Sequence, residues 1–160
     1  MSQKRISGCF TIVFRIGVLM LGSLISLGVS AETEVEQKNA VELFVGNTQN
    51  GSLNGASIGL GYERRLTSLI GVGGYVEHAA GDFDNTAVGA TLSLHPHAGW
   101  EFKFSPGVEF EDGSQNLQFR VGAGYEFEVV PSWAIVPEFN VEFVDGERNL
   151  IYGVSAQYAF

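Results

Sequence analysis

The sequence predicts an all-β protein: an eight-stranded antiparallel up-and-down transmembrane β-barrel that follows a cleaved N-terminal signal peptide. Three observations lead to this prediction. From Ala40 onward apolar and polar residues alternate with a period of two, and no stretch keeps the three- and four-residue spacing of an amphipathic helix. The alternating segments have about the 9–11 residues that a tilted strand needs to cross a bilayer. The alternation is also stricter than a water-facing sheet requires.

The start of the chain has the pattern of a secretory signal peptide. Lys4 and Arg5 make a basic start, an apolar run covers residues 16–29, and small residues lead up to Ala31, after which we expect cleavage. A retained membrane anchor is the competing interpretation, but the apolar run is shorter than the roughly 20 residues of a spanning helix. Cys9 is the only cysteine, so the mature chain is expected to contain no thiol and no disulfide.

We expect one folded domain after the leader. The predicted division is a signal peptide at 1–31, a short periplasmic segment at 32–39, and the outer-membrane barrel at 40–160. Removal of the leader lowers the formal net charge from −9 to −12, because three basic residues leave with it. A chain this acidic is a poor partner for nucleic acid.

Turn residues divide the barrel region into eight strands. The predicted strands cover 40–47, 55–66, 69–79, 85–96, 100–111, 116–129, 133–144 and 148–160. Turns rich in Gly, Asn and Asp follow the first, third, fifth and seventh strands: "GNTQNGSLNG", "HAAGDFDN", "EDGSQN" and "DGERN". Tight links follow the second, fourth and sixth: "RRLTS", "HPHAG" and "VPS". We expect long loops on one side and short periplasmic turns on the other, as in outer-membrane barrels.

The segment at 116–129 shows the two faces of the sheet most clearly. Leu117, Phe119 and Val121 belong to an apolar face that continues to Val129, whereas Gln118 and Arg120 belong to a face with further charges and glycines. In a soluble β-sandwich the apolar face is the core, and in a membrane barrel it faces lipid.

Three features favour the lipid-facing alternative. Glycines recur on the polar face, where a narrow lumen needs space beside long side chains, and the charged residues within the strands from 100 to 144 fall on that face. Trp100 and Trp133 follow short turns, at the level of an interfacial aromatic girdle. Arg64 and His78 face outward, but both lie at strand ends, where their polar groups can reach the interface.

Two prolines conflict with a continuous ladder. Pro106 and Pro137 fall within predicted strands, and proline has no N–H to donate. We expect bulges or local defects at both positions.

The C-terminal segment "IYGVSAQYAF" ends on an aromatic residue, with Tyr158 and Phe160 on the outward face. In a closed barrel this strand pairs with the first one. Here the chain resembles the small eight-stranded outer-membrane barrels of Gram-negative bacteria, of the OmpA-transmembrane-domain, OmpX and opacity-protein type. The resemblance implies that Tyr158 and Phe160 form the signal read by the barrel assembly machinery, although Gly153 and Ser155 depart slightly from its usual pattern.

Segments such as "VGAGYEFEV" and "PEFNVEFVDGE" are also similar to uncharacterised porin-like barrel proteins. The resemblance implies an outer-membrane location, with lipid and lipopolysaccharide as the surroundings. The loops are shorter than the protruding ones of adhesins, so adhesion is not implied. The sequence does not indicate an oligomeric state.

Eight strands give an interior that side chains fill. Hairpin register places Arg120 near Glu142 with Glu109 diagonal to it, and Lys103 and Glu138 one or two layers toward the periplasm. We predict a buried ion network there. Such charges either plug and order the lumen or line a narrow, gated cation path, and both arrangements have the same composition.

No cofactor, metal site or catalytic site is predicted. His95 and His97 are expected to share a face near a periplasmic turn, without the further His or Cys that zinc or copper would need. The "GDFDNT" loop lacks the later Glu of a calcium loop and is interpreted as an acidic outer rim. His78 has no Ser in its strand, so a lipid A-modifying enzyme, which some similar barrels are, is not expected.

The predicted function is therefore an integral outer-membrane barrel with a plugged lumen and a structural or envelope-maintaining role. A narrow cation-selective channel is the first alternative. A soluble periplasmic barrel that binds a hydrophobic ligand, as lipocalins do, is the second, and it requires the apolar face to point inward. A lipid A-modifying enzyme is the third.

Overall fold

The computed structural model describes residues 38–97 and 99–160. The predicted signal peptide, and almost all of the predicted segment 32–39, lie outside these residues. The strands are β1 (Asn39–Asn50), β2 (Leu53–Arg65), β3 (Ile70–Ala79), β4 (Asn85–Leu94), β5 (Trp100–Glu111), β6 (Ser114–Tyr125), β7 (Phe127–Val130), β8 (Trp133–Val144) and β9 (Glu147–Ala159). Within the described part of the chain, no helix is long and apolar enough to cross a membrane.

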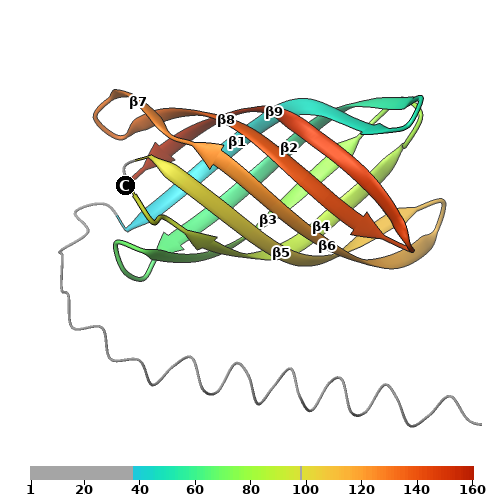
Figure 1. Ribbon diagram of the computed structural model, residues 1–160, viewed down its shortest axis with the longest axis horizontal. Coiled ribbons are helices and arrows are strands. Elements are labelled where there is room, and N and C mark those ends of the chain that lie inside the picture. The colour runs from blue at the N-terminus through green and yellow to red at the C-terminus, as the bar shows by residue number, and fades with distance from the viewer. Residues whose placement is uncertain (1–37, 98) are drawn as a thin grey trace, which may run out of the picture. The chain divides into compact units, whose positions relative to one another are not determined.

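The strands form one closed antiparallel barrel (Figure 1). Each strand from β1 to β5 pairs with the next, β8 pairs with β9, and two further pairings close the ring: β1 with β9 and β6 with β8. The short β7 continues β6 after a break at Glu126 and pairs with the start of β8. Because β7 continues β6, the barrel wall consists of eight strands. The predicted all-β, eight-stranded antiparallel fold is confirmed.

The two ends of the barrel are named here by the termini. The terminal end carries Lys38, Phe160 and the turns 66–69, 95–99 and 131–132, and the distal end carries the turns 51–52, 80–84, 112–113 and 145–146 (Figure 1). Both ends thus have turns of two to five residues. The predicted contrast between long loops and short turns is wrong.

Polar residues at the distal end explain this error. β1 continues to Asn50 instead of ending at Asn47, and Gln49 pairs with Asn54 of β2. Most of the residues predicted to form the first loop are therefore paired strand residues. Where a strand extends beyond the lipid-facing apolar band, it does not need apolar residues. The turns Asp112–Gly113 and Asp145–Gly146 have positive φ at both positions, 48° and 78° in the first and 47° and 83° in the second. This is the geometry of two-residue type I′ hairpins.

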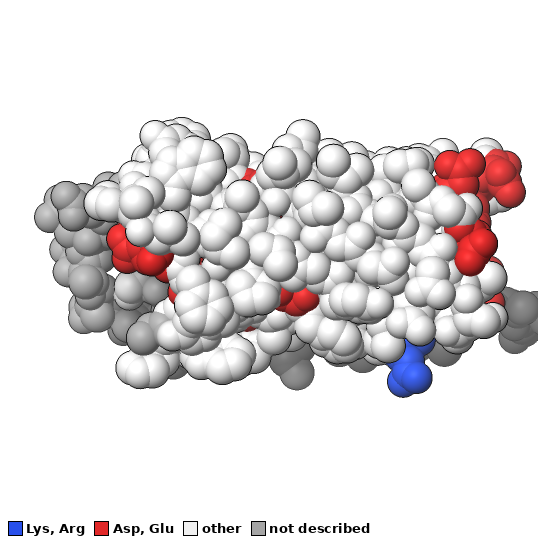
Figure 2. All heavy atoms as spheres, turned by 90° about the horizontal axis from the view of Figure 1, so that it is seen from above, with Lys and Arg blue, Asp and Glu red and all other residues white. Residues whose placement is uncertain are grey.

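The apolar face points away from the barrel interior. Val45, Leu60 and Phe119 are 58%, 60% and 43% exposed, whereas inward-facing Arg120 and Glu142 are only 7% and 3% exposed. On the face shown in Figure 2, acidic groups gather mainly at the two ends and the middle is almost uncharged. The soluble ligand-binding alternative is wrong on this point, because it requires the apolar residues to line the interior.

The outward charges and the prolines behave in different ways. Arg64 and His78 are exposed near the ends of their strands, as predicted. Pro106 pairs in register with Phe119, but the β4–β5 ladder has a gap beside it. Pro137 lies beside the break between β6 and β7. Both prolines thus interrupt one ladder locally, and the expected bulges are absent at these two described positions because the register is the same on both sides of each gap.

Aromatic side chains gather on the outer surface near the terminal end. Trp100 and Trp133 are each 48% exposed. Trp100 stacks on Phe102 with ring centroids 6.2 Å apart, and Trp133 lies 5.0 Å from Tyr158. The structure therefore places both tryptophans where an interfacial girdle is expected.

The C-terminus is part of the ladder. Phe160 donates its backbone N–H to the Asn39 carbonyl at 2.7 Å and accepts a hydrogen bond from the Asn39 N–H at 3.0 Å. Tyr158 pairs with Val41 on one side and with Trp133 on the other. The terminal aromatic residues therefore lie in a strand with two neighbours, as predicted.

Glycine at one inward position makes room for an apolar ring. Phe44 is 5% exposed inside the lumen, and a Cβ added at Gly153 would lie within 2.7 Å of the Val45 carbonyl oxygen, the Gly46 Cα atom and the Phe44 Cε2 atom. We expect Gly153→Ala to lower the free energy of unfolding by about 1–3 kcal/mol, because the crowded backbone cannot move away. Urea titration of the folded protein in detergent measures this loss.

Gly59→Ala is the matched control for that substitution. Gly59 also faces inward, from β2, which is separated from β9 by β1, but the nearest atom to an added Cβ is the Val76 carbonyl oxygen at 3.2 Å. Its loss should be clearly smaller. Equal losses at the two positions would contradict a specific contact with Phe44.

Candidate functional site

Three groups of charged side chains lie one above another in the lumen. The distal cluster consists of Glu77, Arg120 and Glu142. The Arg120 Nη1 atom lies 2.8 Å from Glu77 Oε2, and its Nη2 atom lies 2.8 Å from Glu142 Oε1. All three side chains are at most 8% exposed. Arg120 therefore holds together carboxylates from β3 and β8, two strands that are not neighbours.

Polar and aromatic groups complete this layer. The Tyr75 ring covers Arg120, with the guanidinium carbon 4.6 Å from the ring centroid, and Gln118 donates to the Tyr75 hydroxyl at 2.6 Å. Asn149 donates to Glu142 at 3.2 Å. A cation over an aromatic face is stabilised further when water is excluded.

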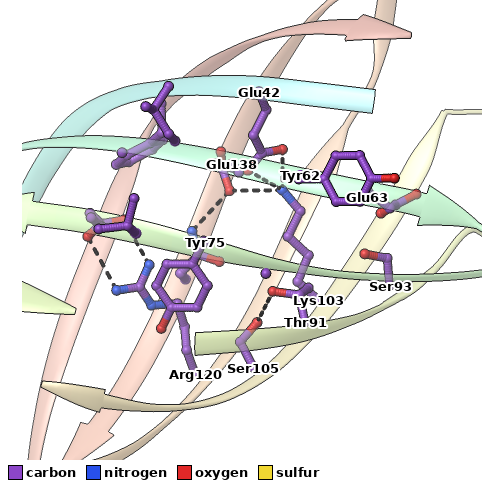
Figure 3. A pocket seen from close by; sticks show the side chains of 18 residues that line it. Glu42, Tyr62, Glu63, Tyr75, Thr91, Ser93, Lys103, Ser105, Arg120 and Glu138 are labelled. Atoms are coloured by element: carbon purple, nitrogen blue, oxygen red, sulfur yellow. Dashed lines mark hydrogen bonds and ion pairs between the residues drawn. The ribbon is translucent and has the colours of Figure 1, made fainter. Parts of the chain in front are cut away.

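The middle cluster consists of Glu42, Lys103 and Glu138. The Lys103 Nζ atom donates to both oxygens of Glu42, at 3.0 and 2.8 Å, and lies 3.7 Å from Glu138 Oε2 (Figure 3). Ser155 donates to Glu138 as well. Lys103 is thus surrounded by carboxylates from both sides of the lumen.

The terminal cluster consists of Glu63, Arg65, His95, Glu101 and Glu126. Arg65 Nη2 pairs with Glu126, and Arg65 Nε lies 3.3 Å from Glu63 Oε1. The His95 Nε2 atom is 3.0 Å from the same Glu63 oxygen and 4.0 Å from Glu101 Oε1. Three carboxylates therefore share one permanent cation and one imidazole.

Each cation spans the barrel. Going round the ring, β5 and β1 are four strands apart, and Lys103 joins them through Glu42. Arg65 on β2 reaches Glu126 at the β6–β7 break, again four strands away. Arg120 on β6 reaches Glu77 on β3. The three layers are therefore cross-braces, because each one links strands on opposite sides of the barrel. Ion pairs between adjacent strands would not link the two sides.

Little free space remains between the braces. A cavity of about 50 Å³ lies beside Lys103 and Arg120, which is room for only a few water molecules. Wider vestibules of about 560 Å³ and 310 Å³ open at the terminal and distal ends. The lumen is thus wide at its mouths and narrow at its centre.

The structure places the predicted lumen residues in different groups. It brings Arg120 to Glu142 and Lys103 to Glu138, but Glu109 accepts a hydrogen bond from Asn85 at 2.7 Å and makes no hydrogen bond or ion pair with Arg120. Glu42 and Glu77 were missed, although both alternate inward in their strands. Their partners lie across the lumen, and hairpin register gives only adjacent strands.

The structure does not place His95 and His97 on one shared face, as was expected from the sequence. The His95 side chain is 8% exposed in the lumen, whereas His97 is exposed in the turn, so they do not share one environment at the membrane interface. His78 faces outward, with Nδ1 3.1 Å from the Thr86 hydroxyl and Nε2 4.0 Å from Asp84. No serine hydroxyl bonds to His78 within the described residues.

Comparison of folds finds several solved structures that this chain resembles. The crystal structure of Ail, the attachment invasion locus protein of Yersinia pestis, is 15% identical and covers 78% of this chain and 99% of its own, with a TM-score of 0.56. Neisserial surface protein A is 11% identical, covering 76% and 96%, with a TM-score of 0.55. The N-terminal β-barrel domain of Pseudomonas aeruginosa OprF is 13% identical, covering 78% and 99%, with a TM-score of 0.53.

No family model matches the sequence, and no curated protein matches it. At these identities the structural likeness shows the fold alone. The chain has the fold of the small eight-stranded outer-membrane barrels, as the sequence analysis predicted.

Proposed function

We propose that this protein is an integral outer-membrane barrel with a plugged lumen, which serves the cell envelope as a structural component. The observation that supports this role best is the set of cross-lumen braces, in which Lys103 and Arg120 each join strands that are not neighbours. A barrel braced in this way resists deformation, and the braces narrow the space left for water along the lumen.

The exterior supports the membrane location. Outward residues such as Val45 and Leu60 are apolar and exposed, and the ladder is closed by β1 and β9. In lipid, every backbone polar group needs an internal partner, which a closed barrel provides. The likeness to outer-membrane barrels points to the same membrane. Insertion by the barrel assembly machinery, read from Tyr158 and Phe160, belongs to this proposal.

A planar-bilayer measurement tests the plug. We expect the wild-type protein to give no ion current above baseline, because three layers of ion pairs close the lumen. The inserted material must first show a shift in electrophoretic mobility between unboiled and boiled samples, which identifies a closed, detergent-resistant barrel. Stepwise openings of the wild type would contradict the plug.

A narrow cation-selective channel is the second candidate, and the charge of the lumen favours it. The three clusters contain seven carboxylates and three permanent cations. Such a surplus of negative charge attracts cations into a narrow space. Cation-selective openings that change in size in Arg120→Ala would support this candidate over the plug.

The envelope role is tested in cells. Removal of the protein should sensitise cells to detergent combined with a chelator, and wild-type protein supplied in trans should restore resistance. Unchanged sensitivity and unchanged leakage of periplasmic proteins would contradict an envelope-maintaining role.

A further inference from the structure

We infer that Glu63, His95 and Glu101 form a binding site for a divalent transition-metal ion, with zinc as the best match to the donor set. The Nε2 atom of His95 and one oxygen from each carboxylate lie within 4.8 Å of one another. Imidazole nitrogen and carboxylate oxygen are both zinc ligands, and a site with three protein ligands leaves the fourth position to water. The inference goes beyond the envelope role and does not depend on it.

Glu101 is a buried carboxylate without hydrogen bonds in the described part of the chain. It is 1% exposed, and neither of its oxygens has a hydrogen-bond partner among residues 38–97 and 99–160. Lys103 Nζ lies 3.5 Å from Oε2, but that cation is already bonded to both oxygens of Glu42. A buried carboxylate without hydrogen bonds is costly, and metal coordination is one of the few ways to satisfy it.

The distances between the candidate ligand atoms also suit a metal ion. His95 Nε2 lies 3.0 Å from Glu63 Oε1 and 4.0 Å from Glu101 Oε1. Two ligand atoms about 2.1 Å from one tetrahedral ion lie about 3.4 Å apart. The three atoms therefore need only small movements to share an ion. Glu101 lies opposite His95 if the β4–β5 register is continued past Leu94, so the backbone already sets one pair.

A glycine on β3 also makes room for Glu63, the remaining ligand. Glu63 is on β2 and His95 follows β4, so the carboxylate must pass over β3 to reach the imidazole. At Gly71 of β3, an added Cβ would lie 2.5 Å from the Glu63 carboxyl carbon. Any larger residue at position 71 would occupy the path of the ligand.

The surroundings suit a cation. The terminal cluster holds three carboxylates and one permanent cation, Arg65, so a divalent ion would balance its charge. The His95 Nδ1 atom lies 3.3 Å from Arg65 Nη2, which can only donate, and 3.6 Å from Glu126 Oε1. A metal on Nε2 would require Arg65 to turn away from Nδ1, so that Glu126 receives the ring proton that a metal-bound imidazole carries on its other nitrogen. Arg65 and Glu126 also line the terminal vestibule of about 560 Å³, which gives an entry path.

Zinc titration of the purified, detergent-folded protein tests the inference. After treatment with a chelator and its removal, Zn²⁺ alone is added, and the bound metal is measured by competition with a chromogenic indicator. We expect one equivalent of zinc per chain, with binding weakened on the order of 100-fold or more in His95→Asn and Glu101→Gln, since ligand loss exceeds the effect of removing outer partners. His97→Asn, which changes an exposed histidine of the same turn, should bind like the wild type.

Two further measurements make the result unambiguous. Co²⁺ in place of Zn²⁺ should give the visible absorption of tetrahedral cobalt in the wild type and in His97→Asn, but not in Glu101→Gln. Each variant is checked for the heat-dependent mobility shift, so that a loss of folding is not read as a loss of binding. Absence of stoichiometric zinc binding by the folded wild type overturns the inference, as does binding that is lost in His97→Asn and kept in His95→Asn.

Discussion

Replacement of Arg120 by alanine should lower the free energy of unfolding by about 3–5 kcal/mol, because it leaves two carboxylates buried without their cation. Glu77 and Glu142 each lie 2.8 Å from the guanidinium and are at most 8% exposed. Neither can move into bulk water from the centre of the lumen. Urea-induced unfolding in detergent, followed by the fluorescence of Trp100 and Trp133, measures the change.

Two controls separate the ion network from a general effect of losing arginine. Arg64→Ala removes an exposed, outward-facing arginine and should change stability by no more than about 0.5 kcal/mol. The triple variant Arg120→Ala, Glu77→Gln and Glu142→Gln should recover a large part of the loss, because no uncompensated charge remains. If Arg120→Ala were as mild as Arg64→Ala, the distal cluster would not be bracing the barrel.

Replacement of Leu60 by arginine should cost about 2–4 kcal/mol when the protein is folded in a lipid bilayer, the cost of placing a cation on the lipid face at mid-depth. Leu60 is 60% exposed near the middle of β2. In water the same substitution would be almost neutral, since an exposed residue of a solvated sheet tolerates charge. The experiment therefore measures which solvent surrounds the barrel.

Depth provides the control for this experiment. Ala56, on the same outward face of β2 but four residues nearer the distal end, is also exposed. Ala56→Arg should cost no more than about 1 kcal/mol, because the side chain reaches the interface. Folding free energies in vesicles, measured by the mobility shift across a urea series, compare the two variants. Similar costs at both depths would mean that the outer face does not lie in lipid.

The inward and outward faces of the strands could be predicted from the sequence because the side-chain period of a strand is two. Gln118 and Arg120 therefore lie inside, and Phe119 lies outside. Hairpin register also predicts a pair such as Arg120 and Glu142, which are direct partners on β6 and β8. These relations depend only on neighbouring strands.

Contacts across the lumen could not be predicted in this way. Whether Lys103 meets Glu42, or Arg65 meets Glu126, depends on the tilt and stagger with which the sheet closes on itself. Alternation does not encode that stagger. His95 was misjudged for a related reason, since it lies one residue beyond β4 and still points into the lumen, where two glutamates from other strands meet it.

If the distal end faces the cell exterior, the distal hairpins also determine how much of this protein is visible from outside an intact cell. Three of the four distal turns have two residues, and the fourth covers only residues 80–84. With the termini at the opposite end, the exposed surface is a narrow rim instead of a set of arms (Figure 1). Proteases cleave extended, mobile loop tips, and antibodies and phages need surface to hold. A barrel with such turns offers few cleavage sites to proteases and few binding surfaces to antibodies and phages.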